Sequence, residues 1–159
     1  MPANAPPRHL YWDSCVFIDY FEATPNRLPL LEDLLREVKE TPDSQIYTSI
    51  ITITELNHLA IKKSQGHLDQ SFLSRVDAMW SDRSILTLVE FNQVIARIAR
   101  DLSRQVISHG WALRPMDAIH LATAVWVKRY LRPIEEIHTY DQRLFKYDKV
   151  VNIKIIEPY

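Results

Sequence analysis

Short β-rich runs alternate with helical segments along the whole chain, and this alternation constrains the fold more than any other feature. The residues between 27 and 40 show the helical pattern well, because their leucines recur on one face. Five short runs rich in apolar and β-branched residues are predicted strands: 9–12, 45–50, 84–89, 136–140 and 152–156. Parallel strands are joined by right-handed crossovers, usually through helices. The order therefore predicts an α/β/α sandwich with a mainly parallel central sheet.

Residues typical of helix starts and helix ends support the predicted helices. Pro115 suits the first position of a helix over 115–128, and Gly110 suits the left-handed end of a helix over 92–109. Gly66 similarly ends a helix that begins at Thr52. The other predicted helical segments are 16–21, 27–40, 68–80 and a short turn over 141–146.

The 159 residues suffice for one domain with its own core. We expect a single domain over 9–159, preceded by a flexible Pro/Ala-containing tail over 1–8. The single cysteine, Cys15, has no intramolecular partner and fits a reducing compartment. No apolar run reaches the roughly 20 residues that a membrane span requires. We therefore expect a soluble cytoplasmic protein without membrane contact. The net charge of −1 neither indicates nor excludes a nucleic-acid partner.

Four acidic residues stand at predicted junctions between elements, and each has an ordinary structural explanation. Asp13 and Asp141 follow strands and could cap the next helical turn. Glu55 completes a capping box with Thr52, and Asp117 suits the dipole of a helix in its first turn. Any one of these residues alone would carry no functional conclusion.

Taken together, these carboxylates predict a metal site. The carboxyl ends of parallel strands share one edge of the sheet, where open α/β folds bind ligands. Four carboxylates in one crevice repel one another unless a cation offsets their charge. Mg²⁺ and Mn²⁺ prefer such oxygen ligands, and a metal so held can activate water and orient a phosphodiester. The predicted chemistry is phosphodiester hydrolysis.

The motifs around the four carboxylates resemble one known family. The segments YWDSCVFI, ITITELNHL, RPMDAIHLATA and HTYDQRLF are, in this order, similar to the PIN domain family, most closely to the VapC-type toxin ribonucleases. The resemblance spans nearly the whole chain. It implies an α/β/α domain that cleaves RNA with Mg²⁺ or Mn²⁺. It also implies a homodimeric toxin that is restrained by a small antitoxin protein.

The resemblance carries site roles to four positions. Asp13 and Asp117 match the family's acidic residues at the first strand and at the late helix, and we expect them to bind the metal most directly. Glu55 is expected to act through water or as a base. Asp141 is expected to act through water or a second metal. All four are thus predicted to be both catalytic and metal-binding.

Five further residues are expected near this site. Ser14 and Thr139 carry hydroxyls suited to supporting the metal ligands, and His120 is interpreted as a packed or supporting histidine. Arg114 lies close to Asp117 in sequence and could bind an RNA phosphate. Trp111 could stack on an RNA base, with core packing as the alternative.

Two alternatives to the toxin stay open. One is a housekeeping PIN nuclease that processes RNA without an antitoxin, and the other is a non-catalytic PIN-like binding module. An antitoxin peptide is expected to dock on the amphipathic segments 16–21 and 27–38. Only two glycines occur, so a glycine-rich phosphate loop and a dinucleotide fingerprint are excluded.

Overall fold

A five-stranded parallel sheet forms the centre of the molecule. The structure, a computed structural model, describes residues 6–63, 65–67 and 69–159. The strands are β1 (His9–Trp12), β2 (Gln45–Ser49), β3 (Leu86–Val89), β4 (Glu136–His138) and β5 (Lys154–Ile156). Their order in the sheet is β3-β2-β1-β4-β5, and every neighbouring pair is parallel.

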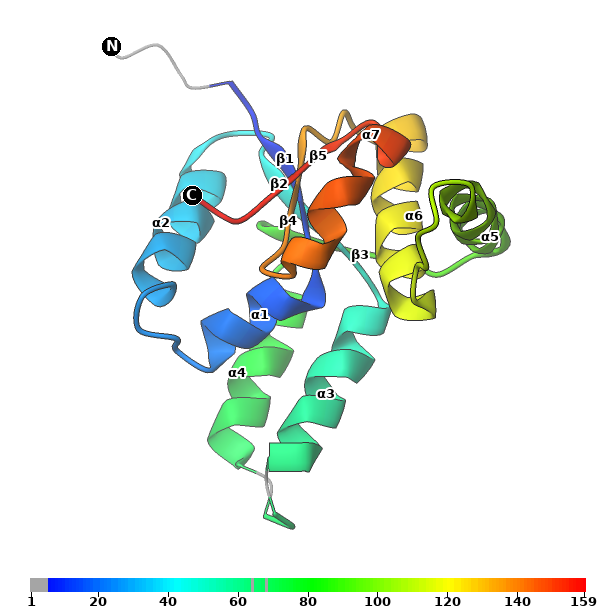
Figure 1. Cartoon of the computed structure of the whole chain (residues 1–159). Helices are drawn as coiled ribbons and strands as arrows, with labels where there is room; N and C mark the ends of the chain where they lie inside the picture. The colour runs from blue at the N-terminus through cyan, green and yellow to red at the C-terminus, as the bar shows by residue number, and fades with distance from the viewer. Residues whose placement is uncertain (1–5, 64, 68) are drawn as a thin grey trace.

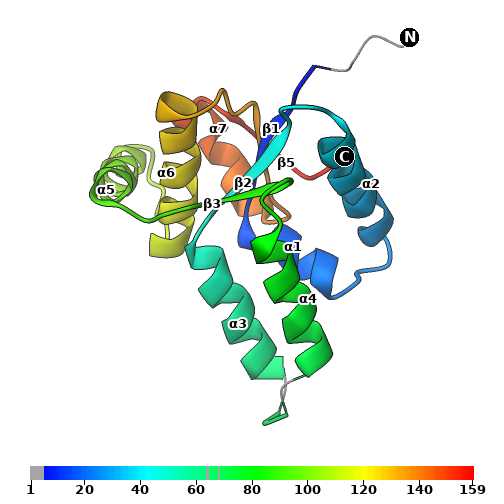
Figure 2. The same cartoon turned by 180° about the vertical axis from the view of Figure 1, so that it is seen from behind.

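Helices cover both faces of the sheet (Figure 1). One face carries α1 (Ser14–Phe21), α2 (Leu28–Glu40), α3 (Ile51–Lys63) and α4 (Gln70–Ser81). The other face carries α5 (Gln93–Ile107), α6 (Pro115–Tyr130), the 3₁₀ helix η1 (Gln142–Tyr147) and α7 (Asp148–Val151). In both views α5 lies outside α6, and the C-terminus lies beside α2 (Figures 1 and 2).

Alternation of side chains along the strands divides the core into two halves. Leu10 and Trp12 of β1 pack in the half that includes α1 to α4, whereas Tyr11 points into the half formed with α5 and α6. All three side chains are fully buried. Side chains of a strand alternate between its two faces, so a strand between two helical layers contributes to both halves of the core.

The strand order reverses at β1, and this reversal positions the site. The chain builds β2 and β3 on one side of β1 and then returns to place β4 and β5 on the other. Ligands of open α/β sheets bind at such a switch point, outside the carboxyl ends of the strands. The backbone N–H of Asp13 donates to the carbonyl of His138 at 3.0 Å, so β1 and β4 stay paired up to this edge.

The predicted α/β/α architecture is confirmed, with differences at element ends. The fourth strand ends at His138 because the next residues turn into the site, where Tyr140 N–H bonds to Cys15 Sγ. The fifth predicted helix ends at Ile107, before Gly110, which still adopts a left-handed φ of 71°. The short helix α7 was not predicted. Leu68, where the fourth predicted helix began, lies outside the described residues.

The predicted N-terminal tail ends where the sheet begins. Residues 1–5 lie outside the described part of the chain, so their flexibility stays a prediction. Arg8 is fixed by contacts: its backbone N–H donates to Ser44 Oγ, and its guanidinium pairs with Glu37 and Glu136. Among the described residues, no helix has the length and hydropathy required to cross a membrane.

Candidate functional site at the carboxyl edge of the sheet

Asp13 lies at the switch point, between the end of β1 and the start of α1. It is the N-cap of α1, and its Oδ1 accepts hydrogen bonds from the Ser14 backbone N–H at 2.7 Å and the Ser14 hydroxyl at 3.3 Å. Its Oδ2 accepts from Thr139 Oγ1 at 2.9 Å and from Cys15 Sγ at 3.3 Å. The side chain is buried, so these donors hold the carboxylate in one orientation.

Thr139 connects this carboxylate to the one after β4. While its hydroxyl donates to Asp13, the same oxygen accepts the backbone N–H of Asp141 at 3.0 Å. Thr139 is completely buried. The positions of Asp13 and Asp141 are therefore coupled through one hydroxyl group.

Cys15 contributes polar contacts to the same place. Its Sγ lies 3.1 Å from Thr139 Oγ1 and accepts the Tyr140 backbone N–H at 3.2 Å. Burial, followed by the charge of Asp13, raises the pKa of the thiol well above its ordinary range. The thiol thus stays protonated and supports the site without being a nucleophile.

His120 connects the site to Glu55. Its Nε2 lies 2.8 Å from Glu55 Oε2 and 3.5 Å from Asp13 Oδ1. Its Nδ1 lies 2.8 Å from the hydroxyl of Tyr11, which also accepts the Ser49 backbone N–H at 3.1 Å. Because an ionised carboxylate only accepts hydrogen bonds, Nε2 carries the proton in the bond to Glu55.

The charges around His120 favour its protonated form. Burial by itself lowers the pKa of this imidazole, but the carboxylates of Asp13, Glu55 and Asp117 outweigh burial and raise the pKa above its usual value. His120 thus offsets negative charge in the interior of the site. The structure places His120 between Glu55 and Asp13, and its supporting role stays a prediction.

Two arginines hold the remaining carboxylates. Arg114, the N-cap of α6, donates to both oxygens of Asp117 at 2.7 and 3.1 Å and to Asp141 Oδ2 at 3.2 Å. Arg143 donates through its backbone N–H and its guanidinium to Asp141, the N-cap of η1. The hydrogen bond from the Arg143 side chain lowers the pKa of Asp141 below its usual value.

The four predicted carboxylates therefore form two connected groups. Asp13 and Glu55 meet at His120, whereas Asp117 and Asp141 meet at Arg114. In the conformation shown, no three His, Cys, Asp or Glu side chains of the described residues are placed to hold one metal ion. The donors fit a hard divalent cation in kind, since all four are carboxylates. Arg114 donates to both oxygens of Asp117, so only the remaining lone pairs of this carboxylate are left for a metal ion.

A pocket of about 460 Å³ lies beside Glu55. Glu55 and Ser14 line it together with apolar side chains from α1, α3 and the start of α6: Ile18, Leu59 and Met116. His58 and Thr54 complete the wall. A ligand in this pocket can reach the carboxylate of Glu55 from solvent.

Sequence reasoning missed three contributors to the site: Tyr11, Cys15 and Arg143. Tyr11 reads as an ordinary strand residue, and only the fold places its hydroxyl against His120. Arg143 could have been noticed, because a cation two residues after an N-cap aspartate can reach back to it.

Trp111 lies in the loop before α6, half-buried and stacked on His109 with ring centroids 4.8 Å apart.

Solved structures share this fold over nearly the whole chain. VapBC2 from Rickettsia felis, bound to a promoter DNA fragment, matches with a TM-score of 0.70 and 13% identity over 94% of this chain and 98% of that one. DNA-bound VapBC from Salmonella typhimurium matches with a TM-score of 0.67 and 14% identity, covering 96% and 99%. VapBC-5 from Mycobacterium tuberculosis, a member of the VapBC family of toxin-antitoxin systems, matches with a TM-score of 0.58 and 19% identity, covering 95% and 99%.

At the sequence level the chain matches the model of one protein family. No curated protein matches the chain significantly. The model of the PIN domain matches residues 10–150, which include all four carboxylates, Arg114 and Arg143. The chain belongs to the PIN domain family.

Proposed function

We propose that the protein is a metal-dependent endoribonuclease and the toxin of a type II toxin–antitoxin pair. Membership of the PIN family and the likeness to solved VapBC structures support a VapC-type nuclease. The observation that carries the proposal is the site itself. Carboxylates from four separate segments converge at the switch point of the sheet, and the chain's own cations hold them there.

Asp13 and Asp117 are the proposed direct ligands of Mg²⁺ or Mn²⁺, with Glu55 and Asp141 contributing directly or through water. PIN nucleases generally use divalent ions, and a bound ion supplies an activated water and stabilises the leaving oxygen. Ser14, Cys15 and Thr139 orient Asp13 for this role. When RNA binds, Arg114 releases Asp117 and donates to a phosphate oxygen of the RNA instead.

Glu55 is the proposed base. Its Oε2 faces His120, and its side chain lines the pocket from which a substrate approaches. His120 holds Oε2 of Glu55, so a proton taken from water would go to the other oxygen of this carboxylate. The Tyr11 hydroxyl in turn fixes the imidazole ring.

The first experiment compares RNA cleavage by the wild type with that by Asp13→Asn and Asp117→Asn, each with Mg²⁺, Mn²⁺ or EDTA. Asp77→Asn, at an exposed position on α4, is the matched control. We expect cleavage only by the wild type and the control, and only with metal. Metal binding without cleavage of any RNA would favour a binding module instead. A wild type that neither cleaves RNA nor binds metal would contradict the proposed metal site, and the four carboxylates would then have only their capping roles.

The proposed antitoxin docks in a groove between α1, α2, α4 and β3. A pocket of about 540 Å³ lies there, and both segments expected to receive a partner contribute to it. Its apolar wall includes Phe17, Phe21, Leu28, Leu35 and Met79. Such a wall suits the apolar face of a partner helix.

Co-expression with the product of the reading frame immediately upstream tests this partner. Leu35→Glu introduces a charge into the groove and should abolish co-purification. Leu131→Glu is the control, since this leucine is exposed at the end of α6. Equal binding by both variants would place the partner elsewhere. A chain that has no such partner and does not harm cells would support a housekeeping nuclease.

We also propose that the protein is a cytoplasmic homodimer. Sedimentation of the purified protein tests the dimer.

A further inference from the structure

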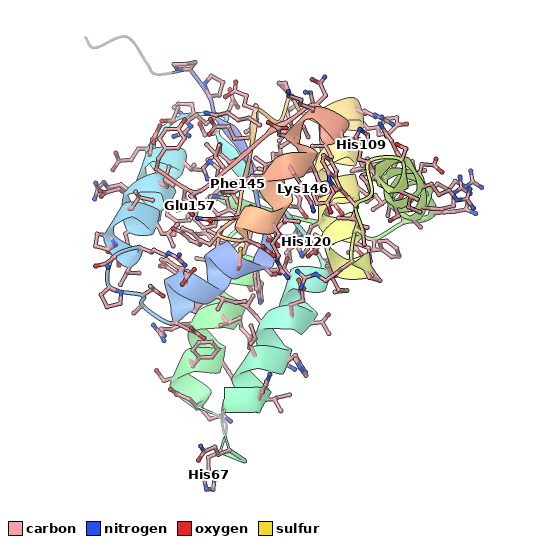
Figure 3. The ribbon with its side chains drawn as sticks, viewed as in Figure 1. His67, His109, His120, Phe145, Lys146 and Glu157 are labelled. Atoms are coloured by element: carbon pink, nitrogen blue, oxygen red, sulfur yellow. The ribbon has the colours of Figure 1, made fainter. Side chains whose placement is uncertain are left out.

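The helix η1 presents a row of cations toward the loop that precedes α6. A 3₁₀ helix has three residues per turn, so positions three apart lie above one another, about 6 Å apart along the axis. Leu144 and Tyr147 form the buried row. Arg143 and Lys146 form an exposed row next to it. Lys146 lies on the side of η1 that faces His109, whereas Glu157 lies beyond the opposite side (Figure 3).

An aromatic pair lies beside this row. The rings of His109 and Trp111 stack at an interplanar angle of 21°, and Lys146 Nζ lies 5.3 Å from the Trp111 ring centroid. Trp111 is also packed edge-on against Tyr147, whose hydroxyl donates to the Ala112 carbonyl at 3.1 Å. The loop is therefore anchored to η1. His109 is exposed and forms the outer end of the stack.

The row and the aromatic pair are continuous with the carboxylate site. Arg143 and Arg114 both contact Asp141, and both guanidinium side chains remain more than half exposed, at 66% and 56%. Within the part of the chain that the structure describes, no carboxylate forms an ion pair with Lys146. The positive charge of this lysine is thus available to a ligand that extends from the site.

We propose that His109, Trp111 and Lys146, with Arg143, form a binding track for the single-stranded RNA segment next to the cleaved bond. A base stacks on the exposed face of His109, and phosphates contact Lys146 and Arg143. Cations that alternate with aromatic rings suit single strands, because phosphates pair with the cations and every base can stack. The proposal rests on the proposed nuclease function and assigns its substrate surface. It also implies that unpaired RNA is preferred, since a base in a duplex cannot reach the stack.

Binding of a fluorescent, unstructured RNA oligonucleotide in EDTA tests the track without cleavage. Anisotropy is measured at pH 8 over a series of salt concentrations, with thermal denaturation of each variant as the check of folding. Lys146→Ala should weaken binding and reduce the slope of log K against log salt by about 0.7, because one phosphate contact is lost. His109→Ala should weaken binding about 5-fold or more with the slope unchanged, because stacking is not ionic.

Lys62→Ala is the matched control, since Lys62 is exposed near the end of α3. This end of α3 points away from α6 and η1 (Figure 1). If the wild type binds RNA but Lys146→Ala keeps the full salt slope, or behaves like the control, the track is overturned. The proposed nuclease function would then still stand. A wild type that neither binds nor cleaves RNA would overturn both.

Discussion

Nε2 of His120 lies 2.8 Å from Oε2 of Glu55, although 65 positions separate the two residues. The contact joins α6 to α3, and on its other side His120 meets the Tyr11 hydroxyl of β1. A buried polar chain of this kind is costly to leave incomplete, because each group left without a partner keeps its full desolvation penalty. His120 therefore links the sheet to a carboxylate at the edge of the site.

Tyr11→Phe should destabilise the protein and slow cleavage. The change removes the hydroxyl that bonds both His120 and the Ser49 backbone N–H, and both groups remain buried. We expect a loss of about 1–3 kcal/mol in the free energy of unfolding. Urea denaturation measures this loss, and cleavage per folded molecule measures the effect on His120. Tyr47→Phe, in the same half of the core, is the control. Equal losses in both variants would mean that the hydroxyl of Tyr11 has no special role.

Thr139→Val should reduce cleavage more than stability. Valine keeps the shape but removes the hydroxyl that donates to Asp13 and accepts from Asp141 N–H. Small displacements of site residues cost large factors in rate, so we expect cleavage to fall about 10- to 100-fold. Thr139→Ser keeps the hydroxyl and should retain most activity. If serine fails as badly as valine, packing of the methyl group matters, and the hydrogen bonds do not explain the loss.

The alternation of strands and helices was enough to predict the layers, because periodicity reports which face of an element is buried. Element ends were less predictable. β4 stops at His138 since Tyr140 bonds to Cys15 across the site, and a contact over this sequence distance leaves no local signal. The short helix α7 is followed by its C-cap Asn152 in a left-handed conformation, which asparagine tolerates better than most residues.

The acidic residues were predictable because each stands at a junction between elements. Both explanations of these residues are compatible with the geometry: Asp13 and Asp141 are N-caps, and they also meet at the hydroxyl of Thr139. The counter-charges were not predicted. From the sequence we expect only a metal to offset the repulsion between these carboxylates, whereas Arg114 and Arg143 offset part of it within the chain. Side-chain partners of this kind depend on rotamers that a sequence pattern does not specify.

His138 should make the protein less stable in mild acid. Burial, opposed by Glu136 and assisted by Arg8 and Lys154, lowers the pKa of this histidine below its usual value of 6.5. Below pH 6.5 His138 therefore binds a proton more readily in the unfolded chain than in the folded one. The free energy of unfolding thus falls as the pH drops toward the lowered pKa. The loss is at most about 1.4 kcal/mol per pH unit.

His138→Gln isolates this contribution. Glutamine does not titrate, and its amide can still donate to Glu136 as Nε2 of His138 does at 3.0 Å. We expect the melting temperature of the variant to fall less than that of the wild type between pH 7 and pH 5. The hydrogen bonds from Lys154 and Tyr159, which also lower the pKa of Glu136, remain in both proteins. A constant difference between the two melting temperatures over this range would contradict the prediction.

Arg114→Gln should increase the affinity of the site for Mn²⁺ while decreasing cleavage. The guanidinium occupies both oxygens of Asp117 and one of Asp141, and it places a positive charge where a cation would bind. One unit charge at about 4 Å from a divalent ion changes its binding free energy by about 2 kcal/mol in water, which corresponds to roughly 30-fold in affinity. The exposed side chain of Arg114 keeps the effect near this solvent-screened limit.

Two measurements separate the roles of Arg114. Calorimetric titration with Mn²⁺ measures the removed repulsion, and the rate of RNA cleavage at saturating metal measures the lost phosphate contact. Arg100→Gln is the control, because this arginine is exposed on α5 and pairs with its sequence neighbour Asp101. Tighter metal binding with slower cleavage is expected of an arginine that releases Asp117 and moves to the substrate. Weaker metal binding in Arg114→Gln would mean instead that the arginine positions Asp117 for the metal, so its salt bridge would be part of the assembled site.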